Sequence, residues 1–312
     1  MERVTEFERG VVMRLHHTLL TVMLALGVAI PCVAQDVDQI QLETTRLTDT
    51  VGVISGGGGN IGVLTGPDGV LLIDTQMGQF EDKIRAAVAA VSDQPVRYII
   101  NTHWHFDHTG CNGCFAEDEP VIIGPEGTRE RMASAQDFPL LGIQSEASAE
   151  TALPTISVTD TMNLTFNGEE IELTHIAGAH SGADLVVQLK HANIIHAGDL
   201  YWSQGYPYIG TPHGGSLDGL IAASNLMLLM ADQETTIIPG HGEVTDSTGL
   251  KAYRDLLVAV RDRIAELIAD GLSVEEILSS HPTAETDEDR KMGMPPELFV
   301  RIVYRDISQR AE

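Results

Sequence analysis

The chain has 312 residues, of which 43% are hydrophobic and 21% are charged. These proportions are typical of a globular protein and exclude a disordered or collagen-like chain. The 45 acidic and 19 basic residues give a net charge of −26, which repels nucleic acids and anionic lipids. We therefore expect neither a nucleic acid nor an anionic membrane surface as a partner.

The first distinctive segment is a largely apolar run at residues 19–30, which Pro31 ends. The run is too short to span a bilayer comfortably but has the length of a signal-peptide core. We predict a signal peptide over residues 1–34, and hence a periplasmic or secreted protein with no stable membrane span after processing. A short membrane anchor is the alternative. Residues 1–12 carry three acidic side chains, which is unusual for a signal peptide, so Met13 is an alternative start.

Hydrophobic periodicity predicts strands and helices in alternation along the mature chain. Strands are expected at residues 41–54, 61–64, 70–74, 96–100, 161–166, 170–176, 185–189, 193–197 and 235–238. Helices are expected at residues 81–91, 128–135, 217–230, 250–270, 274–280 and 297–307. Residues 136–155 and 201–215 are predicted to be long loops. Since no linker divides this pattern, we predict a layered α/β fold in one domain over residues 35–312, with a C-terminal helical extension from about residue 247.

Two cysteines remain in that domain, Cys111 and Cys114. An exported protein meets an oxidising compartment, so we favour a disulfide between these two residues. Free thiols and a metal or redox role stay open as alternatives, although two thiols alone do not complete a tetrahedral metal site.

Histidine and carboxylate side chains follow four of the predicted strands, at the positions where α/β proteins build their sites. The densest group is the pattern His-x-His-x-Asp-His at residues 103–108, and single residues follow three later strands. Imidazole nitrogens and carboxylate oxygens are ligands of zinc, and residues two apart in extended backbone point to the same side. The sequence therefore predicts a metal site made of His103, His105, Asp107, His108, His180, Asp199 and His241.

These motifs, together with residues 72–75 upstream, resemble those of the metallo-β-lactamase superfamily over residues 45–245. The resemblance implies an α/β fold of four layers, an αββα sandwich in which helices flank two mixed β-sheets. It also implies two Zn²⁺ ions per chain, or other divalent metals, at one edge of the sandwich. Residues 56–59, four glycines in a row, would then form a mobile hairpin tip over that edge.

The resemblance also implies a role for each motif residue. The first ion is assigned to His103, His105 and His180. The second ion is assigned to Asp107, His108 and His241, and Asp199 bridges the two ions. Asp74 is assigned to orienting a ligand or the metal-binding loop.

The chemistry that this site implies is hydrolysis. Two close ions hold a bridging hydroxide that attacks a carbonyl, while Asp107 orients the hydroxide and helps to move its proton. Asp199 is similar to the bridging residue of the lactonase and thioesterase branches, whereas export brings the enzyme into contact with β-lactams. We expect an exported zinc-dependent hydrolase with weak, β-lactamase-like amide hydrolysis first, and lactone, ester or thioester hydrolysis second. A non-enzymatic metal-binding protein is the third alternative.

Substrate contacts are expected from the stretch after Asp199, where no lysine or arginine follows closely. Many β-lactamases of the family use a basic residue there to bind the carboxylate of the substrate. The candidate contact residues are Tyr201, Trp202, Ser203, Tyr206 and His213. We expect a small-molecule substrate with a hydrolysable carbonyl, and the sequence leaves the oligomeric state open.

Overall fold

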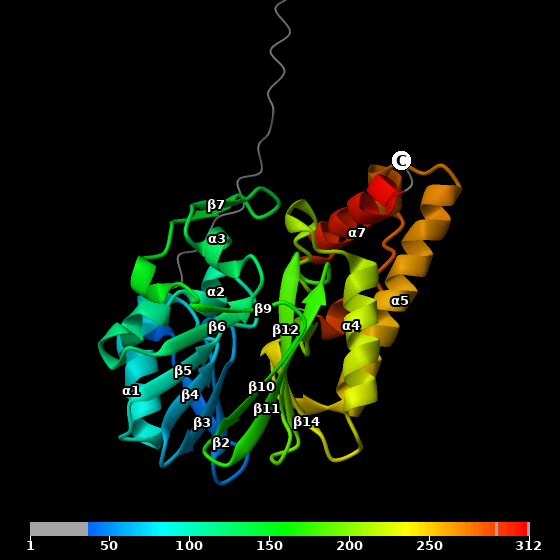
Figure 1. Ribbon diagram of the computed structural model, residues 1–312. Coiled ribbons are helices and arrows are strands. Elements are labelled where there is room, and N and C mark those ends of the chain that lie inside the picture. The colour runs from blue at the N-terminus through cyan, green and yellow to red at the C-terminus, as the bar shows by residue number, and fades with distance from the viewer. Residues whose placement is uncertain (1–36, 291–292, 311–312) are drawn as a thin grey trace, which may run out of the picture. The chain divides into compact units, whose positions relative to one another are not determined.

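Two mixed β-sheets carry most of the hydrophobic segments of the chain (Figure 1). The computed structural model describes residues 37–290 and 293–310, and residues 36–312 form one compact unit. The predicted signal peptide over residues 1–34 and the alternative start at Met13 lie outside the described residues.

Sheet one has seven strands in the order β1-β2-β3-β4-β5-β6-β9. The first four strands of this order pair antiparallel, whereas β4, β5, β6 and β9 pair parallel. The strands are β1 (Glu43–Arg46), β2 (Val51–Ser55), β3 (Ile61–Gly66), β4 (Gly69–Ile73), β5 (Val96–Ile100), β6 (Val121–Pro125) and β9 (Ile156–Val158).

Sheet two has six strands in the order β10-β11-β12-β13-β14-β15. Only β13 and β14 pair parallel, and the other neighbours are antiparallel. The strands are β10 (Thr161–Phe166), β11 (Glu169–Ala177), β12 (Ala183–Leu189), β13 (Ile194–Trp202), β14 (Thr236–His241) and β15 (Thr245–Asp246).

Apolar side chains from both sheets meet in one core between them. Leu71, Ile73 and Ile100 come from sheet one, Leu185 and Val187 come from sheet two, and none of these side chains is more than 1% exposed. Strand β4 is buried along its whole length, as expected for a strand covered on both faces. Because each buried side chain of this size contributes about 1.5–3 kcal/mol, this core fixes how the two sheets face each other.

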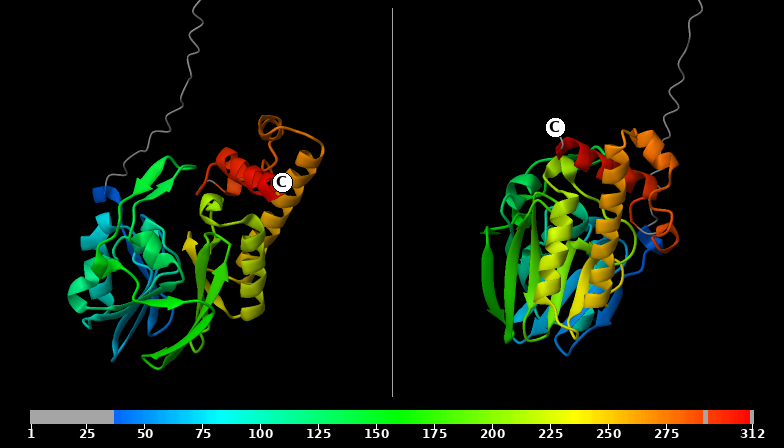
Figure 2. Two further views of the ribbon diagram at one scale, coloured as in Figure 1. Left: turned by 45° about the horizontal axis from the view of Figure 1, so that its top comes forward. Right: turned by 90° about the vertical axis from the view of Figure 1, so that its right-hand side faces the viewer.

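Helices cover the outer faces of both sheets. Helix α1 (Glu81–Val91) packs against sheet one, while α4 (Leu217–Met230) and α5 (Ser247–Ala269) lie side by side on sheet two (Figure 2). The side chains of Ser216 and Asp246 cap α4 and α5 by accepting backbone N–H bonds. The order helix, sheet, sheet, helix confirms the predicted αββα sandwich. The remaining helices are α2 (Phe106–Thr109), α3 (Thr128–Met132), α6 (Val274–Ser279) and α7 (Pro296–Arg310).

Three of the predicted boundaries are wrong. Residues 136–155 are not a plain loop, because β7 (Gln136–Phe138) and β8 (Ile143–Ser145) form a hairpin that buries Phe138. Strand β13 continues through Trp202, which still pairs with β14, so the predicted loop at 201–215 begins inside a strand. The expected long strand at 41–54 is divided into β1 and β2 by a turn. Among the helices in the described ranges, none has the length and apolar composition needed to cross a membrane.

Candidate metal site

The seven predicted ligands come from four separate segments that the two sheets bring together. The run at residues 103–108 follows β5 in sheet one and continues into α2. His180 lies between β11 and β12, Asp199 lies within β13, and His241 is the last residue of β14. Since these segments belong to opposite sheets, the packing of the sheets decides whether the ligands meet.

The first group of potential ligands is fully inside the protein. His105 Nδ1 lies 3.0 Å from His103 Nε2 and 2.9 Å from His180 Nε2. Asp199 Oδ2 lies 3.3 Å from His180 Nε2 and 4.0 Å from His103 Nε2. All four side chains are buried, so their polar atoms converge on one point without access to bulk water.

The second group is close to the first and is more open. His241 Nε2 lies 3.2 Å from both His108 Nε2 and Asp107 Oδ2. The side chains of Asp107 and His241 are 21% and 20% exposed, so this group faces the solvent. Asp199 Oδ1 lies 3.1 Å from His108 Nε2 and 3.3 Å from His241 Nε2. The two oxygens of Asp199 therefore point to different groups, as a bridging carboxylate requires.

The donor chemistry of both groups fits divalent cations such as zinc. Asp199 Oδ1 is buried and makes no hydrogen bond of good geometry in the described part of the chain; the groups that face it are the ring nitrogens of His108 and His241. The five imidazole nitrogens of the two groups lie against one another and against carboxylates. Imidazole and carboxylate are the ligand types of zinc sites, and a cation between these atoms would satisfy them all.

The two groups differ in charge. Burial lowers the pKa of His103 and His105 well below its ordinary value, so both rings are neutral at pH 7 and offer a lone pair. Burial acts in the same direction on His108 and His241, but the carboxylates of Asp199 and Asp107 outweigh it and raise both pKa values, that of His241 to about 9.

The carboxylates respond in the opposite sense. Burial by itself would raise the pKa of Asp107 and Asp199, yet the neighbouring histidines lower the pKa of each below its ordinary value. Both carboxylates are therefore ionised at pH 7, which is the form that binds a cation.

Three contacts orient the histidine rings. Asp74 accepts hydrogen bonds of 2.7 Å from the backbone and from the hydroxyl of Thr102, and its Oδ2 lies 2.8 Å from His108 Nδ1. Thr102 Oγ1 lies 3.0 Å from His103 Nδ1. His180 Nδ1 bonds the backbone carbonyl of Tyr208 at 2.9 Å. Partners of this kind on the second ring nitrogen fix the ring and leave the first for a metal. Asp74 thus contacts one histidine of the second group and the threonine that precedes His103.

The glycine run at residues 56–59 packs into the site and is not a free hairpin tip. Gly59 lies against the ring of His108, and its backbone N–H donates to the carbonyl of Asp107 at 3.2 Å. Asn60 is 2% exposed, and its Nδ2 donates to the carbonyls of Pro239 and Gly242 at 2.9 Å each. Asn60 therefore links the end of the glycine run to the end of β14, where His241 lies.

Sequence reasoning missed Asn60 as well as Thr102. The signal available for Asn60 was its position directly after the glycines. No local sequence pattern predicts its hydrogen-bond partners, which lie 179 and 182 positions away.

The five predicted substrate contacts divide into two sets. Trp202 lies with its ring centre 4.1 Å from that of His241, and the next residue, Ser203, also adjoins this histidine. His213 contacts the rings of Trp104 and Phe138. These three residues lie around the two groups of ligands.

Tyr201 and Tyr206 do not line the site. They are 1% and 0% exposed, and their hydroxyls bond Thr245 and Thr286, on the side of the C-terminal helices. Burial raises the pKa of both phenols. These tyrosines support the fold behind the site.

Cys111 and Cys114 are joined by a disulfide with a Cα–Cα distance of 5.0 Å. The bridge lies directly after the metal-ligand run, and the backbone N–H of Cys111 donates to the carbonyl of Gln76. Gln76 in turn donates from its side chain to the carbonyl of Gly59. The disulfide is therefore connected, through the hydrogen bonds of Gln76, to Gly59, which lies against the ring of His108.

A family model described as the metallo-beta-lactamase superfamily matches residues 54–242. The chain is 21% identical over 281 residues to a linear primary-alkylsulfatase from Pseudomonas sp. (strain ATCC 19151), covering 76% of this chain and 50% of the relative. It is 26% identical over 138 residues to the alpha subunit of a 2,4-dinitroanisole O-demethylase from Nocardioides sp. (strain JS1661), covering 44% of this chain and 39% of the relative. The chain thus spans about half or less of the length of these curated relatives.

Solved structures show the same fold at low identity. A stereoselective inverting sec-alkylsulfatase from Pseudomonas sp. superposes with a TM-score of 0.65 at 16% identity, over 85% of this chain and 50% of that one. A metallo-beta-lactamase from Pontibacter korlensis superposes with a TM-score of 0.55 at 19% identity, over 70% of this chain and 99% of that one. These matches confirm the fold that the motifs predicted.

Proposed function

Because the chain belongs to the metallo-β-lactamase superfamily, we propose that it is a metal-dependent hydrolase of small molecules. The single observation that carries this proposal is the position of Asp199, whose two oxygens face two separate groups of ligands. We propose two divalent cations per chain, zinc being the metal that is typical of this donor set. The first would be held by His103, His105 and His180, the second by Asp107, His108 and His241, with Asp199 shared.

The bound cations would supply Lewis acidity, which lowers the pKa of a water and polarises the bond to be cleaved. Asp107 is ionised, and its Oδ2 is engaged by His241, which leaves Oδ1 to accept a proton and to return it to the leaving group. Trp202 packs on His241 and excludes water from one side of the site. The exposed edges of Asp107 and His241 give the substrate its way in.

For the substrate, an ester bond is favoured over a β-lactam. The guanidinium of Arg290, beside Trp202, points at the backbone carbonyls of Trp202, Ser203 and Gly205, so it is not free to bind the carboxylate of a β-lactam. Losing such a charge-assisted hydrogen bond costs about 1.5–3 kcal/mol. Carboxylic esters and lactones need no such anchor.

A second candidate is hydrolysis of a sulfate ester, and the similarity to alkylsulfatases favours it. The acidity of the protein counts against it, because a net charge of −26 repels an anionic substrate at long range. Phe106, which lies within the ligand run and is partly buried, would suit an alkyl or aryl group.

We also propose that the enzyme is exported, on the strength of its N-terminal sequence pattern. The disulfide between Cys111 and Cys114 is consistent with an oxidising compartment.

The test is a panel of substrates given to protein whose metal content has been measured. The panel contains phenyl acetate, a γ-lactone, a thioester, a chromogenic cephalosporin and an alkyl sulfate. We expect two ions per chain and the highest kcat/KM for the neutral esters, with loss of activity after chelation and recovery with zinc. His103→Ala serves as the inactive control. Two bound ions without turnover of any member would instead favour the metal-binding protein.

A further inference from the structure

A pocket adjoins the metal-ligand run at residues 103–108. Its volume is about 340 Å³, and it lies between that run, α3 and the β7–β8 hairpin. Trp104 and Phe106, which alternate with the ligands along the chain, form part of its wall. The ring of Trp104 contacts that of His105 at 4.4 Å, so the pocket is one side chain away from the first group of ligands.

Arg131 on α3 brings a positive charge into this pocket. Its guanidinium lies over the indole of Trp104, 5.4 Å from the ring centre, and the side chain is half-buried. Within residues 37–290 and 293–310 the guanidinium has no ion pair and no hydrogen bond, although Glu146 lines the same pocket. Burial and then the charge of Arg131 lower the pKa of the nearby His213, and the charge of Asp137 acts in the opposite direction.

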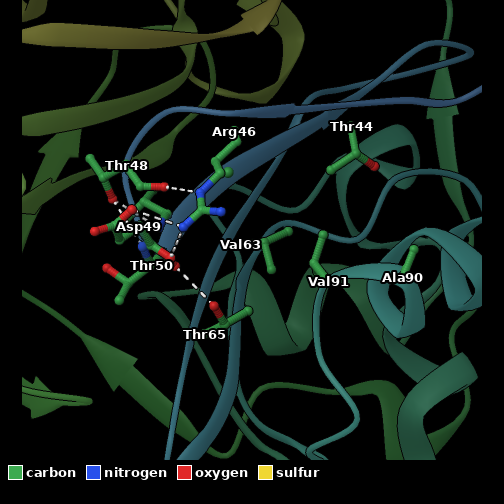
Figure 3. Close-up of a pocket in the computed structure, with 11 residues that line it drawn as sticks. Thr44, Arg46, Thr48, Asp49, Thr50, Val63, Thr65, Ala90 and Val91 are labelled. Atoms are coloured by element: carbon green, nitrogen blue, oxygen red, sulfur yellow. Dashed lines mark hydrogen bonds and ion pairs between the residues drawn. The ribbon is translucent and has the colours of Figure 1, made fainter.

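Another pocket that is lined by an arginine offers a comparison, because this guanidinium donates hydrogen bonds to acceptors within the protein. Arg46 lines a pocket of about 250 Å³ near the turn between β1 and β2 (Figure 3). Its Nε donates to the carbonyl of Thr48 at 2.8 Å, and its Nη2 donates to the backbone and the carboxylate of Asp49 at 3.0 and 2.9 Å. Intramolecular acceptors therefore satisfy Arg46, whereas Arg131 keeps its donors free.

Several other polar side chains of the Arg131 pocket can donate hydrogen bonds to an anion. Gln144, Ser145 and Ser148 line it, and their side chains make no hydrogen bond with the described residues. In a protein with 45 acidic side chains, a guanidinium that is stacked on an indole and lacks an acidic partner is set up for an external anion. The planar fork of arginine matches the two oxygens of a carboxylate.

We infer that this pocket binds the carboxylate of a small organic acid, with Arg131 as its anchor and Phe106 against the apolar part of the ligand. The indole of Trp104 contacts the guanidinium of Arg131 as well as the ring of His105, and so separates the two. The carboxylate is therefore remote from the bond that the proposed reaction cleaves, and it is not the β-lactam carboxylate considered above.

The test uses benzoate as the probe and benzamide as its neutral isostere, both titrated by calorimetry into the metal-loaded protein. Arg131→Met keeps the apolar stem over Trp104 but removes the charge. We expect benzoate to bind about tenfold more weakly to this variant than to the wild type, at equal metal content, and benzamide to bind equally to both. Arg46→Met is the matched control and should bind benzoate as the wild type does.

Arg131→Lys is the second variant, because it keeps the charge and places a smaller demand on folding. It should lose part of the benzoate affinity, since an ammonium group lacks the bidentate fork. The inference is overturned if the wild type shows no saturable benzoate binding, or if Arg131→Met and Arg46→Met bind benzoate alike. Calorimetry needs no turnover, so this result is independent of whether the proposed hydrolase activity is found.

Inhibition of ester hydrolysis then separates two sources of the carboxylate. Competitive inhibition by benzoate that is lost in Arg131→Met would make the pocket a subsite for the substrate. Inhibition that lowers kcat without raising KM would make it a site for a separate acid. Both outcomes require Arg131 and support the pocket.

Discussion

Replacing Gly59 by alanine should damage one half of the metal site and spare the other. A Cβ on residue 59 would lie 2.3 Å from Cε1, 2.6 Å from Nδ1 and 2.7 Å from Nε2 of His108. The ring would have to move by about 1 Å to restore an ordinary contact. The ring cannot move freely away from residue 59, because His108 Nδ1 lies 2.8 Å from Asp74 Oδ2 and would lose this contact. Gly59 is not among the glycines with a positive φ, so alanine adds no backbone strain and the effect comes from the contact alone.

The consequence follows from the tolerance of a metal site. Metal–nitrogen distances stay within about 0.2 Å of their ideal values, so a shift of this size removes His108 as an effective ligand. We expect the affinity for the second ion to fall about 10- to 100-fold while the first ion stays bound, with a loss of stability of about 1–3 kcal/mol from overpacking.

The assay is competition for zinc against a chromophoric chelator, followed by metal analysis of the dialysed protein. Gly113→Ala is the control, since a Cβ there meets nothing nearer than Ala152 at 3.7 Å. The wild type and the control should retain two ions per chain where Gly59→Ala retains one. If Gly59→Ala holds both ions with the affinity of the wild type, His108 is not a metal ligand and the proposed pairing of the two groups is wrong.

Three further predictions follow from the same geometry. Asp199→Asn should weaken both ions and reduce hydrolysis by orders of magnitude, because a neutral amide is a poor bridge; normal metal content and activity would exclude the bridging role. Asn60→Ala should cost about 2 kcal/mol in chemical unfolding through two lost hydrogen bonds, and should weaken the second ion more than the first in the zinc competition. In the metal-free protein the pKa of His241 is raised to about 9, so zinc must displace a proton at neutral pH. The affinity for the second ion should therefore rise about tenfold per pH unit for each displaced proton, up to about pH 9. The affinity for the first ion should change little with pH. Calorimetry in buffers of different ionisation enthalpy measures the number of protons released.

The ligands could be predicted because the information for them is local. The run at residues 103–108 places four potential ligands within six positions after an apolar strand, and the structure brings these side chains together with His180, Asp199 and His241. The alternation of apolar strands with helices predicted a layered α/β domain, and the four-layer sandwich came from the resemblance of the motifs to a known family. The role of Asp74 also came from that resemblance; in the structure Asp74 follows β4 and contacts Thr102 and His108.

The remainder depends on contacts that no local pattern encodes. Strand β13 is buried at all nine of its positions, so no alternation tells which side chains face the metal ligands and which face the C-terminal helices. Tyr201 and Trp202 are neighbours there, yet Tyr201 bonds Thr245 whereas Trp202 packs on His241. The β7–β8 hairpin escaped prediction because each strand has three residues, too few to show a period.

The position of the site between the two sheets explains why distant residues matter so much to it. The run at residues 103–108 belongs to sheet one, while His180, Asp199 and His241 belong to sheet two, so any cation held by both sets links the sheets. Asn60, which precedes β3, makes the same link through three hydrogen bonds, two to carbonyls of Pro239 and Gly240 in β14 and one to the carbonyl of Gly242 after it. Leu185 in β12 adds another by donating to the carbonyl of Thr102 at 2.7 Å. These hydrogen bonds join the two halves of the ligand set through the polypeptide itself, so the fold contributes to the entropy of bringing the ligands together.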